Sequence, residues 1–146
     1  YYLELLRRAG LIPKLPQVDA IRLEGARDAR HGGIELLREA GLGDFVVGIS
    51  PGAAYGTAKR WLPDRFAAAA AEISSRTGAS AAVFGSAAER PLCEEVAAAL
   101  RKAGVTVRNF AGETTLAQFI AMAAACRVLL TNDSGAMHIA SALGTP

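Results

Sequence analysis

The sequence has little cysteine, little aromatic content and little net charge. Two cysteines, Cys93 and Cys126, occur in 146 residues; both lie in apolar helical patterns, which predicts buried free thiols in a reducing compartment. The net charge is +2 and no basic run carries interleaved aromatic residues, so no nucleic-acid partner is predicted. No apolar run is long enough to cross a bilayer and no signal-peptide pattern is present, which favours a cytoplasmic location.

Several motifs that define common enzyme classes are also missing. There is no G-x-x-x-x-G-K-[ST] and no G-x-G-x-x-G that opens a helix, which argues against kinases, P-loop NTPases and standard dinucleotide dehydrogenases. There is likewise no G-x-S-x-G, no H-E-x-x-H and no convincing carboxylate pair. The sequence therefore has no nucleophile motif, and we predict no metal site and no bound cofactor.

A regular alternation of strand and helix patterns fills the chain after residue 43. Hydrophobic residues make up 51% of the sequence, which is enough for a core in one domain of this length. Short apolar runs predict strands, and periodic stretches with a proline start or a glycine stop predict helices. The predicted strands are 45–50, 80–84, 105–109 and 127–131, and the predicted helices are 63–77, 87–103, 114–126 and 134–143. This order predicts an α/β fold with a Rossmann-like, doubly wound parallel sheet.

The first 43 residues have a more polar pattern. They predict a helix over 1–9, a proline-rich connector, an alternating edge strand over 18–23, and a charged helix over 26–40 that carries His31. The chain begins within a helical pattern and ends after a glycine turn. We therefore expect a fragment of a longer protein, in which residues 1–43 connect two lobes.

The connections that follow the four predicted strands are rich in glycine, hydroxyl groups and isolated charges. Ligands of open α/β sheets bind beyond the carboxyl ends of the strands, and small residues let backbone N–H groups approach an anion at helix N-termini. We therefore expect a phosphate or nucleotide site at this edge of the sheet. The candidate residues there are Thr57, Lys59, Gly85, Ser86, Thr114, Thr115, Asp133, Ser134, Gly135 and His138.

The charged candidates each have a structural interpretation as well. Lys59 offers a compact cation for a diphosphate, and Arg60 could add a second charge. The same residues also fit a solvated turn with Trp61 packed on the following helix, which the spacing by itself favours. Asp133 fits the N-cap of the last helix, with Ser134 as the first helical residue.

The remaining polar candidates are open to the same two interpretations. His138 lies one turn after Ser134 on the same helix face, yet a lone histidine there is more often structural than catalytic. Thr114 and Thr115 are helix-capping residues first. Glu113 fits either an acceptor for a sugar hydroxyl or an acid stabilised by a helix N-terminus.

The polar loops taken together carry a resemblance to a known family. The strings ISPGAAYGTAKRWLPDRFA, VFGSAAE and NFAGETTLAQFIAMAAACRVLLTNDSGAMHIASALGTP resemble the family-9 glycosyltransferases. Within that family they are most similar to the ADP-heptose:lipopolysaccharide heptosyltransferases, and NDSGAMH resembles the type II enzymes. The resemblance covers residues 44–146 and, more weakly, residues 1–43.

The resemblance implies a GT-B architecture, with two Rossmann-like lobes and the active site between them. Residues 44–146 would form the sugar-nucleotide lobe that holds ADP-heptose, and residues 1–43 the end of the N-terminal lobe and the inter-lobe connector. The acceptor would be a lipid-linked core oligosaccharide, which implies peripheral association with the cytoplasmic face of the inner membrane. The family is thought to invert the anomeric centre by direct displacement without a metal, and its proposed general base lies in the N-terminal lobe, outside this sequence.

The same resemblance assigns roles to individual residues. It places Lys59 and Thr57 at the diphosphate, with Lys59 stabilising the leaving group, and it places Asp133 at the heptose hydroxyls. An acidic residue that meets the ribose in the family is not evident directly after Gly85. The remaining assignments are Gly85 and Ser86 near the adenosine, Thr114 and Thr115 in the nucleotide pocket, and Ser134, Gly135 and His138 facing the phosphates. Two alternatives stay open: a nucleotide-binding lobe without chemistry of its own, and a GT-B enzyme for another sugar nucleotide.

Overall fold

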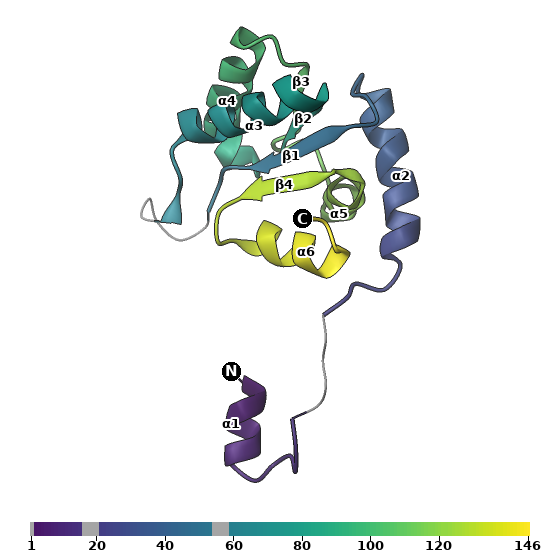
Figure 1. The fold of residues 1–146 in the computed structure, drawn as a ribbon, viewed down its shortest axis with the longest axis vertical. Helices are drawn as coiled ribbons and strands as arrows, with labels where there is room; N and C mark the ends of the chain where they lie inside the picture. Colours follow the sequence, from purple (N-terminus) through teal and green to yellow (C-terminus); the bar gives the residue numbers. More distant parts are fainter. Residues whose placement is uncertain (1, 16–20, 54–58) are drawn as a thin grey trace.

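A four-stranded parallel sheet forms the centre of the protein, in a computed structural model that describes residues 2–15, 21–53 and 59–146. The strands lie in the order β3-β2-β1-β4 (Figure 1). Ile49 pairs with Val83 on one side and with Leu130 on the other. The strand bounds are β1 Val46–Ser50, β2 Ser80–Val83, β3 Val107–Asn109 and β4 Val128–Thr131. The α/β fold with a parallel sheet, expected from the sequence, is confirmed.

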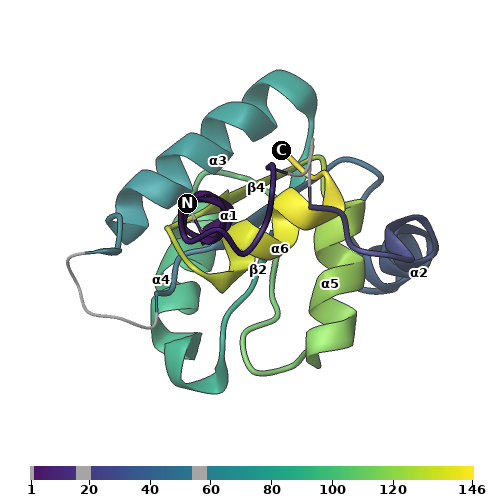
Figure 2. The ribbon, with the colours of Figure 1, turned by 90° about the horizontal axis from the view of Figure 1, so that it is seen from below.

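Helices cover both faces of this sheet, as a doubly wound fold requires. On one face, α3 and α4 bury Phe66 and Val96 in a core with β1 and β2. On the other, α2, α5 and α6 bury Leu37, Met122 and Ala140. Figure 2 shows α5 lying between α6 and α2. The helix bounds are α1 Tyr2–Arg8, α2 Ala26–Glu39, α3 Pro63–Thr77, α4 Arg90–Lys102, α5 Leu116–Ala125 and α6 Gly135–Leu143.

The chain winds outward in opposite directions from the boundary between β1 and β4, which are neighbours in the sheet. The connection after β1 leads to α3 on one face, whereas the connection after β4 leads to α6 on the other face. In open α/β sheets, a crevice forms at such a switch point, beyond the carboxyl ends of the strands. The strand order therefore brings the loop that carries Lys59 and the loop that carries Asp133 to one place.

Local sequence signals explain where several helices begin and end. Pro63 is the first residue of α3, and Gly78 ends this helix with a φ of 70°, a left-handed conformation that glycine adopts without strain. The helix predicted over 87–103 begins instead with a 3₁₀ turn, η2 Ala87–Glu89, before α4. The reason is a capping box between Ser86 and Glu89, which forms its own short turn ahead of the longer helix.

The segment before β1 differs from its prediction in one respect. Residues 18–20 of the predicted edge strand lie outside the described residues, and residues 21–23 are not in a strand. The backbone N–H of Leu23 donates instead to the carbonyl of Ala142 near the end of α6, at 2.9 Å. Ile21 is 79% exposed, so the alternating pattern buries no face and gives the segment no reason to join the sheet.

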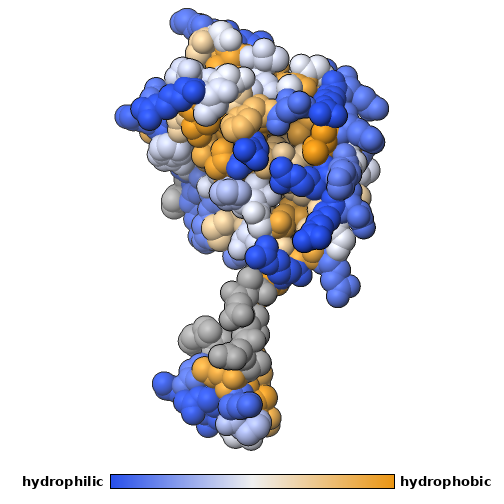
Figure 3. Space-filling view, turned by 45° about the vertical axis from the view of Figure 1, so that its right-hand side comes forward, coloured by the Kyte–Doolittle hydropathy of each residue, from blue (hydrophilic) through white to orange (hydrophobic). Residues whose placement is uncertain are grey.

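The two helices of the first 43 residues have different surroundings. In α2, Gly33 lies so close to α5 that a Cβ there would overlap the carbonyl of Ala121. In contrast, α1 stands apart from the sheet (Figure 1) and exposes Leu3, Leu5 and Leu6. Figure 3 shows hydrophobic surface at the end of the molecule that contains α1. The division into residues 1–43 and 44–146 stays a prediction. Among the described residues, no helix has the length and apolar character needed to cross a membrane.

Candidate functional site

A cavity of about 290 Å³ opens beyond the carboxyl ends of the strands. Four chain segments that are distant in sequence build its wall: the connections after β1 and β2, the start of α5 and the start of α6. Among the candidates from the sequence, the lining includes Gly85, Ser86, Thr114, Thr115 and Ser134. The other lining residues are Ser50, Gly52, Ala53, Phe84, Glu89, Leu116, Phe119 and Ala136.

Two glycines let the wall of the cavity pack closely. A Cβ on Gly52 would overlap the carboxylate of Glu89, and a Cβ on Gly85 would lie 2.7 Å from the sulfur of Cys93. Cys93 is fully buried, and its burial raises the pKa of the thiol to about 12. Both cysteines, Cys93 and Cys126, are buried and free, as predicted.

The sequence reasoning missed Glu89, which lines the cavity. Its Oε2 accepts hydrogen bonds from the Ser86 backbone N–H at 2.9 Å and from the Ser86 hydroxyl at 2.8 Å. The available signal was the S-x-x-E spacing of a capping box, which turns the glutamate back toward the end of the preceding strand. A carboxylate can accept further hydrogen bonds, so Glu89 adds a strong acceptor to a wall rich in hydroxyl groups.

The first turn of α5 faces the cavity. Thr115 is the N-cap: its hydroxyl accepts from the N–H of Gln118 at 3.2 Å, and Gln118 Oε1 accepts from the N–H of Thr115 at 2.9 Å. This confirms the capping interpretation of Thr115. Thr114 lines the cavity beside it. The positive end of the helix dipole therefore faces the cavity, which favours a negatively charged ligand.

The loop between β3 and α5 is braced by Glu113. Its carboxylate pairs with Arg90 at 2.8 Å and with Arg108 at 3.0 Å, and Arg90 also donates to the carbonyl of Ala111. The hydrogen bond from Arg90, followed by that from Arg108, lowers the pKa of Glu113. Glu113 does not line the cavity, so the structure gives no support to its interpretation as a sugar-hydroxyl acceptor.

Lys59 and Asp133 meet across the switch point. The Lys59 Nζ lies 2.9 Å from Asp133 Oδ2, joining the connection after β1 to the connection after β4. Both side chains are exposed, and the hydrogen bond from Lys59 lowers the pKa of Asp133. The interpretation of Asp133 as a helix cap is wrong, because Ser134 is the N-cap of α6 and Gly135 its first residue. The carboxylate is turned toward the lysine instead.

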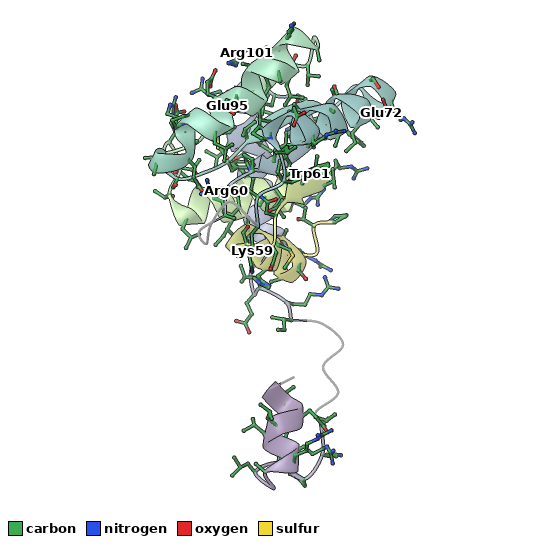
Figure 4. The ribbon with its side chains drawn as sticks, turned by 90° about the vertical axis from the view of Figure 1, so that its left-hand side faces the viewer. Lys59, Arg60, Trp61, Glu72, Glu95 and Arg101 are labelled. Atoms are coloured by element: carbon green, nitrogen blue, oxygen red, sulfur yellow. The ribbon has the colours of Figure 1, made fainter. Side chains whose placement is uncertain are left out.

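The residues after Lys59 anchor this connection (Figure 4). Arg60 donates to the carbonyl of Ala53, with Nη2 at 3.0 Å and Nε at 3.3 Å. The Trp61 ring contacts that of Phe66 in α3, with centroids 5.2 Å apart and an edge-to-face orientation, which confirms the packing of Trp61 on the helix. Arg60 therefore braces its own loop in this structure.

The other candidates occupy different positions. Gly135 and His138 are exposed and do not line the cavity. His138 is close enough to Asp133 to contribute to the lowered pKa of that carboxyl, after the larger effect of Lys59. Thr57 lies outside the described residues. Within the described ranges, no three His, Cys, Asp or Glu side chains converge as a metal site would require.

Comparison with known proteins identifies the family. The profile of "Glycosyltransferase family 9 (heptosyltransferase)" matches residues 14–146. The chain belongs to glycosyltransferase family 9. Lipopolysaccharide heptosyltransferase 2 of Salmonella typhimurium is 41% identical over 102 residues, which are 69% of this chain and 29% of that protein. The family-9 chain thus spans about three tenths of the length of this curated relative.

Solved structures share the fold of this family-9 chain. The structure of E. coli ADP-heptose LPS heptosyltransferase II matches with a TM-score of 0.75 and 34% identity, over 90% of this chain and 40% of the other. A family-9 glycosyl transferase from Veillonella parvula matches with a TM-score of 0.75 and 26% identity, over 99% of this chain and 40% of the other. The matches agree with the resemblance seen in the sequence motifs.

Proposed function

We propose that this chain is the sugar-nucleotide lobe of an inverting heptosyltransferase. The enzyme would move L-glycero-D-manno-heptose from ADP-heptose to the inner core of lipopolysaccharide. Family membership and the names of the relatives support this. The structural observation that carries it is the Lys59–Asp133 pair, which sets a cation and a carboxylate beside a nucleotide-sized cavity at the switch point. Residues 44–146 would hold the donor, and residues 1–43 would lead to the acceptor lobe.

The cavity and the ion pair suit different parts of the donor. The adenosine would occupy the cavity between Gly85, Ser86 and Thr114, where Glu89 offers a carboxylate to the ribose hydroxyls. The diphosphate would meet Lys59 and the N-termini of α5 and α6. Asp133 would then accept hydrogen bonds from heptose hydroxyls. Thr57, Ser134, Gly135 and His138 are proposed to flank the phosphates.

The chemistry would be a direct displacement at the anomeric carbon. As the bond from this carbon to the β-phosphate oxygen breaks, its electron pair goes to ADP, and negative charge grows on the leaving phosphate. Lys59 would stabilise that charge, an effect that is larger in the transition state than in the bound donor. The acceptor hydroxyl, deprotonated by a base from the acceptor lobe, would attack from the opposite side. The acceptor would be a lipid-linked core oligosaccharide at the cytoplasmic face of the inner membrane.

Calorimetric titration with ADP-heptose, ADP and UDP-glucose tests the donor assignment. We expect ADP-heptose to bind, UDP-glucose not to bind, and both Lys59→Ala and Asp133→Ala to weaken ADP-heptose binding about tenfold or more. Lys59→Ala should also weaken ADP binding, whereas Asp133→Ala should not weaken it, because ADP lacks the sugar and Lys59 is then free for the diphosphate. The matched control is Arg38→Ala, which removes another exposed ion pair, 2.8 Å from Asp44, and should change no affinity.

The outcomes also separate the two alternatives. Equal binding of ADP-heptose and UDP-glucose would indicate a GT-B enzyme for another sugar nucleotide. Binding of ADP with no gain from the heptose would indicate a nucleotide-binding lobe alone. An unchanged affinity in Lys59→Ala would contradict the proposed role of the ion pair.

A further inference from the structure

Two consecutive residues after β4 hold two residues of the connection after β1. Asn132 Oδ1 accepts a hydrogen bond from the backbone N–H of Trp61 at 2.9 Å, and Asp133 Oδ2 lies 2.9 Å from the Nζ of Lys59. Lys59 and Trp61 are two positions apart. The two contacts therefore run side by side across the switch point, one inside the protein and one at its surface.

The inner contact belongs to a larger network. Asn132 is buried, with 8% of its surface exposed. Its Nδ2 donates to the carbonyls of Pro51 at 2.8 Å and Gly52 at 3.3 Å. One amide thus ties the chain directly after β1 to the chain directly before α3. No buried side-chain polar atom of the described residues lacks a hydrogen-bond partner.

The two contacts differ in how firmly they can fix a geometry. The Lys59–Asp133 pair has side-chain exposures of 55% and 63%, so water competes for both charges and the pair by itself holds the loop weakly. The Asn132 amide is shielded from water, and breaking its bonds would leave buried carbonyls and an N–H unpaired. The buried amide is therefore the contact that can set where the lysine lies.

We propose that Asn132 is the positioning residue for Lys59. By fixing Trp61 against Pro51 and Gly52, it sets the backbone two residues after Lys59 and so directs the ammonium group to the place where Asp133 meets it. This inference rests on the proposed function for what Lys59 binds in the working enzyme. The positioning itself can be measured on this chain without any ligand.

The protein contains a matched control for this residue. Asn109 is the last residue of β3, Asn132 is the first residue after β4, and 9% of the surface of Asn109 is exposed. Its Oδ1 accepts from the N–H of Ala111 at 3.0 Å, and its Nδ2 donates to Glu94 at 2.8 Å. Replacing either asparagine by alanine removes a buried, hydrogen-bonded amide at a strand end, but neither hydrogen bond of the Asn109 amide reaches the connection that carries Lys59.

The test is an NMR titration of the Asp133 carboxyl between pH 2 and 6. In the parent chain, the pKa of Asp133 lies below its ordinary value because Lys59 donates to it, with a smaller contribution from His138. We expect Asn132→Ala to raise this pKa to the value found in Lys59→Ala, and Asn109→Ala to leave it unchanged. His138 is retained in every variant, and its contribution to the pKa of Asp133 is smaller than that of Lys59. A folded Asn132→Ala with the parent pKa would overturn the proposal.

A milder variant covers the case in which Asn132→Ala does not fold. Asn132→Ser keeps a short hydroxyl that can serve one of the three hydrogen bonds but cannot reach all of them. We expect a folded protein with an Asp133 pKa between those of the parent and Lys59→Ala. A parent-like pKa in this variant, with loss of the Trp61 amide's protection from hydrogen exchange, would also overturn the proposal.

ADP binding then links the positioning to the proposed function. If the parent chain binds ADP, Asn132→Ala should weaken binding about as much as Lys59→Ala, roughly tenfold, and the double variant should lose no more than either alone. Additive losses would show that Asn132 does not act through Lys59. If the parent chain binds no ADP, the proposed donor site fails on this chain, while the titration still decides the positioning.

Discussion

The two edges of the sheet carry similar ion pairs in different surroundings. At the amino edge, Arg38 pairs with Asp44 at 2.8 Å; at the carboxyl edge, Lys59 pairs with Asp133 at 2.9 Å. The first pair joins residues six positions apart and the second joins residues 74 positions apart. A short exposed ion pair therefore does not by itself mark a site, and what surrounds the pair has to decide.

The helix ends provide that difference. The amino edge receives the C-termini of α2, α3 and α4, which are followed by Gly41, Gly78 and Gly104 with φ between 70° and 79°. The polar groups there serve the backbone, as when the Ser80 hydroxyl accepts from the N–H of Gly43. The carboxyl edge receives helix N-termini, whose free N–H groups and positive dipole ends favour anions. The same sheet thus has one edge that receives the negative ends of helix dipoles and one edge suited to a phosphate.

The largest difference between the two edges should appear in the free energy of unfolding when an aromatic side chain is removed. Phe84, 1% exposed, stacks on Phe110 beneath the cavity, whereas Phe45 at the amino edge is 38% exposed under the guanidinium of Arg127. We expect Phe84→Ala to cost about 3–5 kcal/mol because it leaves a cavity in the core. Phe45→Ala should cost under about 1 kcal/mol. Urea denaturation measures both, and equal losses would show that the core does not extend under the cavity.

One glycine at each edge allows the two edges to be compared by their effect on ADP affinity. In Gly52→Ala the new methyl group would displace the flexible carboxylate of Glu89, since the two would overlap. We expect ADP affinity to fall about tenfold, or roughly 1.4 kcal/mol, with little change in stability. Gly43→Ala at the amino edge is the control, because its Cβ would meet nothing within 4 Å. Unchanged affinity in Gly52→Ala would show that Glu89 does not contact the nucleotide.

The smallest expected effect is a difference between the two ion pairs in how the pKa of the carboxyl group responds to ADP. Hydrogen bonds from Arg38 and Lys59 lower the pKa values of Asp44 and Asp133. Each pair therefore stabilises the fold above the ordinary carboxyl pKa and loses that contribution as pH falls through the lowered value. Saturating ADP should raise the pKa of Asp133, because Lys59 turns to the diphosphate, and leave that of Asp44 unchanged. An NMR titration with and without ADP measures this, and parallel shifts at both carboxyls would point to a non-specific effect of the nucleotide.

Local patterns predicted most of the fold. The helix over 63–77 was predicted to the residue, because proline and glycine mark its ends chemically. The four strands were placed within two residues of their observed starts and one residue of their ends. The predicted edge strand failed in its described part, residues 21–23, because a short alternation carries no information about whether a partner strand is present.

The candidate site was predicted less completely. The loops after the strands were identified because small and hydroxyl residues gather there, and five of the candidate residues line the cavity. Glu89 was missed because its place depends on a turn three residues long that bends back on Ser86. The interpretation of Asp133 as a cap failed for a related reason: the sequence shows that a helix follows, but not that a lysine 74 positions away competes for the carboxylate.

The sequence by itself determined the order of strands and helices along the chain and the chemistry of each loop. Both follow from properties of neighbouring residues: hydrophobic period, capping groups and turn formers. Only the tertiary structure decided that Asn132 holds Trp61 and that Asp133 meets Lys59. These contacts exist because β1 and β4 are neighbours in the sheet while the helices that follow them pack on opposite faces. That arrangement is set by burying both faces of the sheet at once, which no local pattern records.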